Sequence, residues 1–327
     1  MPSLACQMPN APHGSLVVVD NGHVVARSFE SNGATEAMEV RTVGKTLSTP
    51  NSTPVQSEAW FARQELALGR SGQARLRQVR VAVIGLGGIG SVVTMQLAHL
   101  GVGELVLIDG DVVEASNLSR IVGARQDDVA RTAKVEVARR YAESLGFSRV
   151  ETIPNYLGTE HEALLASCDV IFSCVDRQLP RALLNQIAYR YLVPTIDLGT
   201  VFRVDESGFM TSDAGRVVVI GPGRPCLSCW GHIDPHALRI ESLAATDREA
   251  LAREGYIEGA HEAQPSVMAF NTLVAGAGVM EFMRLVTAFA GAQSPPNRMA
   301  FSFSEGTVKR NALVGNGECR ICGAVRT

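Results

Sequence analysis

A glycine-rich loop followed by a carboxylate is the first part of the chain that could do chemistry. The loop, GLGGIG, lies between an apolar run of β-branched residues and a segment with apolar residues at helical spacing. Without side chains there, a nucleotide can approach the backbone at the positive end of a helix dipole. A carboxylate follows about 20 residues later, where it can accept hydrogen bonds from ribose hydroxyls. The predicted nucleotide-binding residues are Gly85, Gly87, Gly88, Gly90 and Asp109.

Two alternatives stay open for this loop. Its glycines could serve only to pack a helix against a strand, and a loop of this kind binds NAD as well as ATP. The polar residues that follow favour ATP, because two cations and a carboxylate suit a triphosphate and its Mg²⁺ better than a nicotinamide. We expect them at the carboxyl ends of parallel strands. They are Asp111, Asn117, Arg120, Lys134 and Asp176.

Four of the seven cysteines form two Cys-x-x-Cys pairs in the second half of the chain. Each pair can supply two corners of a tetrahedron, and four thiolates close a zinc site with no position left for water. Such a site is structural and ties the end of the chain to an earlier segment. Disulfides, free thiols, or a histidine ligand from His232 or His236 are the alternatives. The predicted zinc ligands are Cys226, Cys229, Cys319 and Cys322.

Strands and helices alternate between residues 79 and 197, which predicts an α/β fold with a Rossmann-like, doubly wound and mostly parallel sheet. The expected strands are 79–84, 104–108, 149–154, 169–174 and 193–197, and the expected helices are 91–100, 130–145, 160–166 and 179–189. Later β-like runs at 216–220, 299–303 and 307–313, with a long helix at about 266–285, predict a C-terminal β-containing part. We interpret the polar segment 230–264 as a loop-rich crossover.

We divide the chain into an N-terminal extension, residues 1–56, and a main domain, residues 57–327. Within the extension, two β-rich runs flank Asn21-Gly22, a pair that favours the tight turn of a hairpin. Residues 47–54 contain two prolines and little apolar content, so we interpret them as a linker.

The composition is that of a globular chain, with 46% hydrophobic and 19% charged residues. A formal net charge of -3, without runs of Lys or Arg, argues against a nucleic-acid partner. The N-terminus does not resemble a secretory signal. The most apolar window, 273–292, contains Glu281 and Arg284, so we predict a buried helix and no membrane partner. We expect a cytoplasmic protein.

As a set, these motifs resemble the ubiquitin-activating-type adenylyltransferases, the family of ThiF, MoeB and HesA. The shared pieces are Gly-x-Gly-Gly-x-Gly, Asp-x-Asp, Asn-Leu-x-Arg, a helical Lys and Cys-x-Asp, and the resemblance covers about residues 59–323. It implies ATP-dependent adenylation of the C-terminal carboxylate of a small ubiquitin-like or sulfur-carrier protein that ends in Gly-Gly, with release of pyrophosphate.

The resemblance also implies roles for single residues. Arg63 matches a family arginine that reaches the ATP phosphates from a neighbouring protomer, so a homodimer is implied. Cations and metal would stabilise the charge that grows as a carboxylate attacks the α-phosphorus, so no general base is required. The other implied contacts are Asp109 to the ribose, Asn117, Arg120 and Lys134 to phosphates, and Asp176 to Mg²⁺.

The cysteines depart from the family pattern. Relatives can carry a nucleophilic cysteine in the crossover segment, but residues 230–264 contain none, and Tyr256 occupies that position. Cys168 and Cys174 are interpreted as packing residues, and Cys6 lies in the extension. We therefore expect catalysis to stop at the adenylate.

Three other functions stay open at this stage. The same chemistry could act on a peptide, as it does in relatives that modify peptide antibiotics. The chain could instead be a non-catalytic subunit of a heterodimeric activating complex, although such subunits often lack residues equivalent to Arg120, Lys134 and Asp176. A third function, an NAD-dependent dehydrogenase, lacks an evident proton-transfer residue and leaves the cysteine pairs unexplained.

Overall fold

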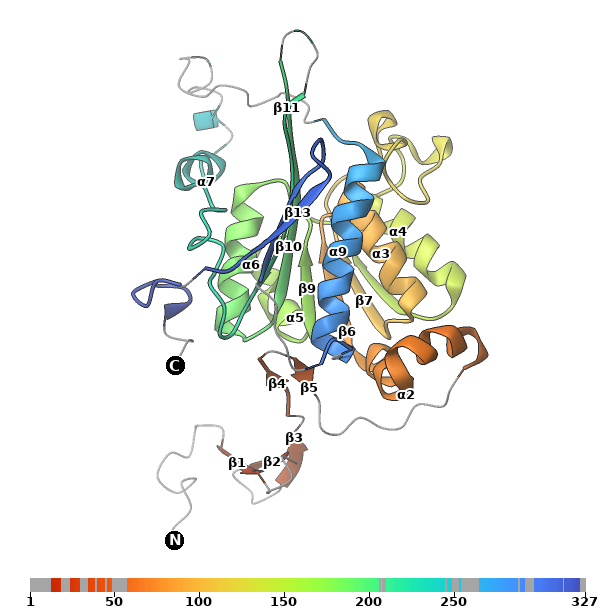
Figure 1. Cartoon of the computed structure of the whole chain (residues 1–327), viewed down its shortest axis with the longest axis vertical. Helices are drawn as coiled ribbons and strands as arrows, with labels where there is room; N and C mark the ends of the chain where they lie inside the picture. The colour runs from red at the N-terminus through yellow and green to blue at the C-terminus, as the bar shows by residue number, and fades with distance from the viewer. Residues whose placement is uncertain are drawn as a thin grey trace.

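The computed structural model describes most of the main domain and parts of the N-terminal extension (Figure 1). The described residues are 13–18, 24–29, 35–38, 40–44, 46–48, 58–205, 207, 210–244, 246–248, 253, 265–287, 289–291, 297–313 and 315–323. Cys6, Asn21-Gly22 and Tyr256 lie outside them, as do most of the predicted linker and much of the predicted crossover segment.

An eight-stranded sheet forms the centre of the protein, in the order β13-β12-β11-β10-β9-β6-β7-β8. The five strands from β8 to β10 run parallel, and the other three add antiparallel at one edge. The parallel strands are β6 (Arg80–Ile84), β7 (Glu104–Ile108), β8 (Arg149–Ile153), β9 (Val170–Ser173) and β10 (Thr195–Val204). The antiparallel strands are β11 (Met210–Ile220), β12 (Arg298–Ser302) and β13 (Thr307–Asn311). The predicted doubly wound, mostly parallel sheet is therefore confirmed.

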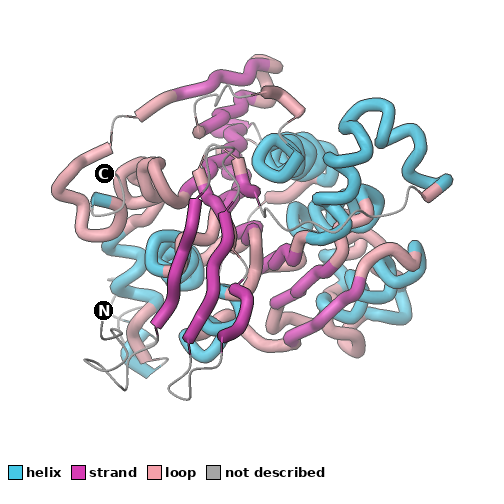
Figure 2. Tube along the Cα trace, turned by 90° about the horizontal axis from the view of Figure 1, so that it is seen from below, coloured by secondary structure: helices cyan, strands magenta, loops and turns pink. Residues whose placement is uncertain are grey.

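Helices cover both faces of this sheet (Figures 1 and 2). One face packs against α2 (Ala62–Gln78), α3 (Gly88–Leu100), α4 (Lys134–Leu145) and α9 (Met268–Thr287), and the other against α5 (Glu162–Ala166) and α6 (Gln178–Arg190). A shorter helix, α7 (Pro235–Glu241), follows the antiparallel strand β11. Short 3-10 turns cover Ala59–Phe61, Ala115–Asn117, Gln126–Asp128 and Thr159–His161. Burial on both faces explains why β6 and β7 are continuous apolar runs rather than alternating ones.

The strand order reverses direction between β6 and β9. The chain moves outward from β6 to β7 and β8, then returns to add β9 on the other side of β6. In sheets of this kind the crevice at such a reversal opens at the carboxyl ends of the strands. The loops after β6, β7 and β9 meet there, and they carry most of the polar residues predicted from the sequence.

The long helix α9 is mostly a core element. By length and composition alone it could cross a membrane, and half of its most apolar window is buried inside the protein. It packs against α2, α3, β10 and β11. Its acidic residue, Glu281, is buried and pairs with Arg310 (2.7 Å) and Arg284 (3.5 Å).

The N-terminal extension contains two small sheets. Strands β1 (His13–Val18), β2 (Val24–Phe29) and β3 (Thr35–Met38) pair antiparallel, and so do β4 (Thr42–Val43) and β5 (Leu47–Ser48). Leu47, which we assigned to the linker, is only 4% exposed and belongs to the large hydrophobic core of the main domain. Arg41 also reaches the main domain, where it pairs with Asp169 (3.2 Å). The division of the chain at residue 56 stays a prediction.

Leu47 provides a test of how firmly the extension is attached. Leu47→Ala should lower the free energy of unfolding by about 2–3 kcal/mol, because it leaves a cavity in a packed core. The matched control is Leu16→Ala, at a leucine that is 60% exposed, and it should change stability little. Urea unfolding of both variants measures the difference, and equal stabilities would show that the contact contributes nothing.

Candidate active site

Close packing surrounds three glycines of the glycine loop, and the fourth has free space beside it. A Cβ atom at Gly85, whose φ is +85°, would lie 2.8 Å from the carbonyl oxygen of Cys174. At Gly88 it would lie 2.2 Å from Asn271 Nδ2, and at Gly90 only 1.8 Å from the carbonyl oxygen of Gly85. A Cβ at Gly87 would meet no described atom within 4 Å. Three glycines therefore serve packing, and Gly87 leaves space for a ligand beside the start of α3.

Asp109 fastens this loop to the end of β7. Its Oδ2 accepts a hydrogen bond from the Leu86 backbone N–H (2.6 Å), and its Oδ1 accepts one from the Asp111 N–H (2.8 Å). Burial raises the pKa of Asp109, against the opposing effect of Lys134 and of the two N–H groups. Each carboxylate oxygen can accept a second hydrogen bond. The geometry therefore leaves this carboxylate able to bind a ribose hydroxyl.

Asp111 forms the second polar contact of the site. It accepts hydrogen bonds from Lys134 Nζ (2.7 Å) and from the Tyr156 hydroxyl (2.6 Å). Burial acts to raise the pKa of Asp111, but these two hydrogen bonds and the nearby cations together lower it. The same contact raises the pKa of Tyr156 to about 12. The structure thus brings Asp111 and Lys134 together and adds Tyr156, which our sequence reasoning missed because a lone tyrosine three residues after a strand carries little signal.

Asn117 and Arg120 lie together on the loop that follows β7. Asn117 is buried, and its side chain accepts from the Glu114 N–H (3.2 Å) and donates to Ser116 Oγ (3.2 Å). Arg120 donates from Nη1 to the Ser116 carbonyl (2.8 Å), and its Cδ lies 3.4 Å from where a Cβ at Gly88 would be. Asn117 therefore shapes the turn, and the turn holds Arg120 against the start of α3.

Asp176 lies in the loop between β9 and α6. It is exposed, and none of the residues that the structure describes forms a hydrogen bond or ion pair with its carboxylate. The next residue, Arg177, pairs with Glu241 (3.8 Å), which also accepts from the Gln178 and Leu179 N–H groups at the start of α6. Asp176 is therefore available to bind a cation at the carboxyl edge of the sheet.

Arg63 is the one predicted catalytic residue that lies elsewhere in the chain. It is exposed on α2, and its neighbour Gln64 donates to the His99 carbonyl (2.9 Å) near the end of α3. Because α3 begins at Gly88 and has 13 residues, its two ends are about 20 Å apart. Within one chain, Arg63 is therefore far from the glycine loop.

The four paired cysteines converge into one cluster. All four sulfur atoms lie within 4.8 Å of one another, with Cys226 and Cys319 at 3.7 Å and Cys229 and Cys322 at 3.6 Å. Thiolates bound 2.3 Å from a tetrahedral zinc ion would lie about 3.8 Å apart, so the geometry fits zinc. Burial acts to raise the pKa of Cys319, but backbone N–H groups outweigh it and lower the pKa to about 6. This cysteine cluster also packs against α6 and β11.

The two cysteines near the sheet are poor nucleophiles. Burial raises the pKa of Cys168 to about 12 and raises that of Cys174 further. A thiol with a raised pKa is protonated at neutral pH and reacts slowly. Both cysteines therefore fit a packing role.

The chain is similar to known proteins in family, in sequence and in fold. The model of the ThiF family matches residues 61–321. The chain is 28% identical to adenylyltransferase and sulfurtransferase uba4 of Aspergillus terreus over 314 residues, which cover 92% of this chain and 60% of that protein. It is 34% identical to the SAMP-activating enzyme E1 of Haloferax volcanii over 182 residues, which cover 55% of this chain and 63% of that protein. The chain thus spans less than two thirds of the length of these relatives.

Solved structures share the fold. The crystal structure of E. coli MccB with ATP has a TM-score of 0.62 and 21% identity, covering 82% of this chain and 75% of MccB. The crystal structure of PaaA has a TM-score of 0.57 and 22% identity, covering 82% of this chain and 88% of PaaA. At these identities the likeness is one of fold.

The cysteine cluster can be tested by metal analysis. The purified chain should contain about one zinc ion, and Cys319→Ser should lose it and unfold at a lower temperature, because metal binding contributes folding free energy. Ser228→Ala is the matched control within the same loop and keeps all four thiols. Elemental analysis measures the zinc content, and thermal unfolding measures the stability. Wild-type protein that contains no zinc and unfolds at the same temperature as Cys319→Ser would contradict the assignment.

Proposed function

The chain belongs to the ThiF family, and from this premise we propose that it joins the C-terminal carboxylate of a small ubiquitin-like or sulfur-carrier protein to AMP. The main support is the gathering of the glycine loop, Asp109, Arg120, Lys134 and Asp176 at one edge of the sheet. Two relatives, an adenylyltransferase and sulfurtransferase and a SAMP-activating enzyme, support the substrate class.

ATP is the proposed nucleotide. Asp109 would hold the ribose, with its carboxylate already fixed by the Leu86 and Asp111 N–H groups. Asp176, exposed and free of ion pairs among the described residues, would hold Mg²⁺ beside the phosphates. When bound, the metal neutralises phosphate charge.

The reaction needs positive charge more than proton transfer. A substrate carboxylate is ionised at neutral pH and can attack the α-phosphorus directly, while pyrophosphate leaves. Arg120 lies at the start of α3, and Lys134 is held nearby by Asp111. When a phosphate binds, the Lys134 ammonium would release Asp111 and bind the phosphate oxygens. It would then stabilise the negative charge that grows on those oxygens during the reaction.

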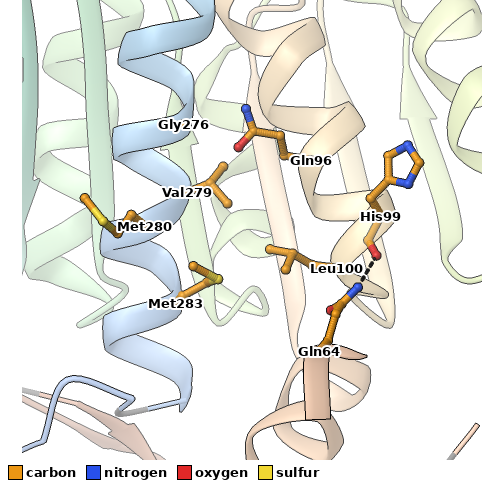
Figure 3. Close-up of a pocket in the computed structure, with 8 residues that line it drawn as sticks. All are labelled: Gln64, Gln96, His99, Leu100, Gly276, Val279, Met280 and Met283. Atoms are coloured by element: carbon orange, nitrogen blue, oxygen red, sulfur yellow. Dashed lines mark hydrogen bonds between the residues drawn. The ribbon is translucent and has the colours of Figure 1, made fainter. Parts of the chain in front are cut away.

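A homodimer is part of the proposal, because Arg63 lies far from the glycine loop of its own chain. An open groove of about 270 Å³ runs between α2, α3 and α9 (Figure 3), and supports a partner at this surface. Its lining is Gln64, Gln96, His99, Leu100, Gly276, Val279, Met280 and Met283. Two large apolar residues beside Arg63 are also exposed, Trp60 at 64% and Leu66 at 89%.

The remaining assignments concern zinc, location and the end of the reaction. We propose zinc in the cysteine cluster and a cytoplasmic location, where unpaired thiols stay reduced. We also propose that the reaction stops at the adenylate, supported by the raised pKa values of Cys168 and Cys174. A reducible thioester between enzyme and substrate would overturn that last assignment.

ATP-pyrophosphate exchange tests the activity directly. With Gly-Gly-terminated candidate proteins, wild type should catalyse exchange, and Asp176→Ala should reduce it by about a hundredfold or more through loss of the cation site. Asp127→Ala, at an exposed carboxylate elsewhere, is the control and should keep full activity. Exchange that survives in Asp176→Ala would contradict the assigned role of Asp176. Exchange with peptides but not with Gly-Gly-terminated proteins would mean that the substrate is a peptide.

Mixing two inactive variants tests the shared site. If Arg63 acts on the partner's site, a 1:1 mixture of Arg63→Ala and Asp176→Ala chains should recover about a quarter of wild-type exchange, because half of the dimers carry one intact site of two. Each variant alone should stay inactive. If the subunits do exchange between dimers and the mixture still recovers no activity, Arg63 acts in the site of its own chain or has no role in catalysis.

A further inference from the structure

A third cation, besides Arg120 and Lys134, lies at the carboxyl edge of the sheet. Arg177 follows Asp176 in the loop between β9 and α6, and its side chain is 47% exposed. Within the described part of the chain its one ion pair is with Glu241, where Nε and Oε2 are 3.8 Å apart. That distance is too long for a hydrogen bond. The guanidinium is therefore held loosely, and its donors are available to a ligand.

The strand order places Arg177 on the opposite side of the glycine loop from Asp111. Strand β6, which leads into the loop, lies between β9 and β7. Arg177 follows β9, and Asp111 follows β7. Burial acts to raise the pKa of Asp111, the hydrogen bonds from Lys134 and Tyr156 lower it, and the positive charge of Arg177 lowers it further. The loop therefore lies between Arg177 on one side and the Asp111–Lys134 pair on the other.

Glu241, the last residue of α7, is bound more firmly to α6 than to Arg177. Its Oε1 accepts a hydrogen bond from the Gln178 N–H (2.9 Å), and its Oε2 accepts one from the Leu179 N–H (2.8 Å). At the other end of α7, the Asp234 N–H donates to the Gln178 side chain (3.2 Å). Both oxygens of Glu241 thus have partners on α6. Arg177 can therefore leave Glu241 without leaving a carboxylate that lacks hydrogen bonds.

The chemistry of an arginine at this position suits a phosphate. A guanidinium group carries a permanent positive charge and several N–H donors, and its planar shape matches pairs of phosphate oxygens. In the proposed nucleotide site, Asp109 would hold the ribose at the end of β7, and Asp176 would hold Mg²⁺ after β9. The phosphates would then extend from the β7 side of the glycine loop toward the loop that carries Arg177.

We propose that Arg177 is a further phosphate-binding residue, which leaves Glu241 and binds the phosphates of ATP. The inference rests on the proposed function. Without ATP, Glu241 keeps the guanidinium beside the start of α6. With ATP, the phosphate oxygens supply stronger acceptors, because they can form charge-assisted hydrogen bonds where Glu241 provides only a long ion pair. Glu241 therefore competes with the nucleotide for Arg177, and the two residues affect ATP affinity in opposite directions.

Titration calorimetry with ATP and Mg²⁺, without any protein substrate, tests the contact independently of catalysis. Arg177→Gln should weaken ATP binding about tenfold, as expected for loss of a hydrogen bond to a charged group, and should leave adenosine binding unchanged. Arg177→Lys should keep part of the affinity, because it keeps the charge. The matched control is Arg239→Gln, which removes an exposed arginine from α7 and should bind ATP as wild type does. Equal ATP affinities of wild type and Arg177→Gln would overturn the proposal.

Glu241→Gln tests the competition. It should tighten ATP binding about threefold, the scale of an exposed ion pair, and it should change nothing in an Arg177→Gln background, because the gain depends on release of Arg177. An equal gain in both backgrounds would mean that Glu241 acts only by repelling phosphate, and would overturn its role as a competitor. Should Glu241→Gln fail to fold, the two variants at the half-exposed Arg177 still decide whether it binds phosphate.

The same measurements separate this inference from the proposed function. Wild type that binds no ATP would overturn both. Wild type that binds ATP and catalyses pyrophosphate exchange, with an affinity that Arg177→Gln leaves unchanged, would reject only the role of Arg177. ATP binding that depends on Arg177, without exchange, would keep the phosphate contact and reject adenylation. If Arg177→Gln weakened adenosine and ATP binding by the same factor, its effect would not be on the phosphates, and the proposal would fail.

Discussion

The site depends on one carboxylate that accepts two backbone hydrogen bonds. Asp109 binds the N–H of Leu86 in the glycine loop and that of Asp111 after β7, so it fixes two loops from neighbouring strands to each other. Close contacts at Gly85, Gly88 and Gly90 hold the same loop from the other side. The loop therefore has little freedom, and a nucleotide binding at Gly87 would meet a preformed surface rather than one that must be ordered.

Two cationic side chains at this edge of the sheet are held in ion pairs with carboxylates. Lys134 is held by Asp111, and Arg177 is held by Glu241, which also binds the start of α6. Each pair fixes a cation at this edge of the sheet. Asp176 differs, since no described residue neutralises it, and this difference fits a residue that binds a metal ion rather than a side chain.

The cysteine cluster determines where the C-terminal part lies. Cys319 and Cys322 close onto Cys226 and Cys229 and fix the segment after β11 against α6. That attachment positions Trp230 against the Arg298 guanidinium, and the segment after Trp230 is fixed to the start of α6, near Asp176. The cysteine cluster and the loop that carries Asp176 are thus connected through one helix.

Local sequence patterns were enough to predict the glycine loop, the alternation of strands and helices, and the two cysteine pairs. These features depend on neighbours in the chain: φ angles that favour glycine, apolar periodicity, and the two-residue spacing of a thiolate pair. The packing of the whole fold was needed to show that Tyr156 binds Asp111, that Leu47 is buried, and that Arg63 lies far from its own glycine loop. It also places Asp197 and Arg298 on strands that pair with the same residue, Val218. Those relations depend on strand order and register, which bring together residues that no local pattern connects.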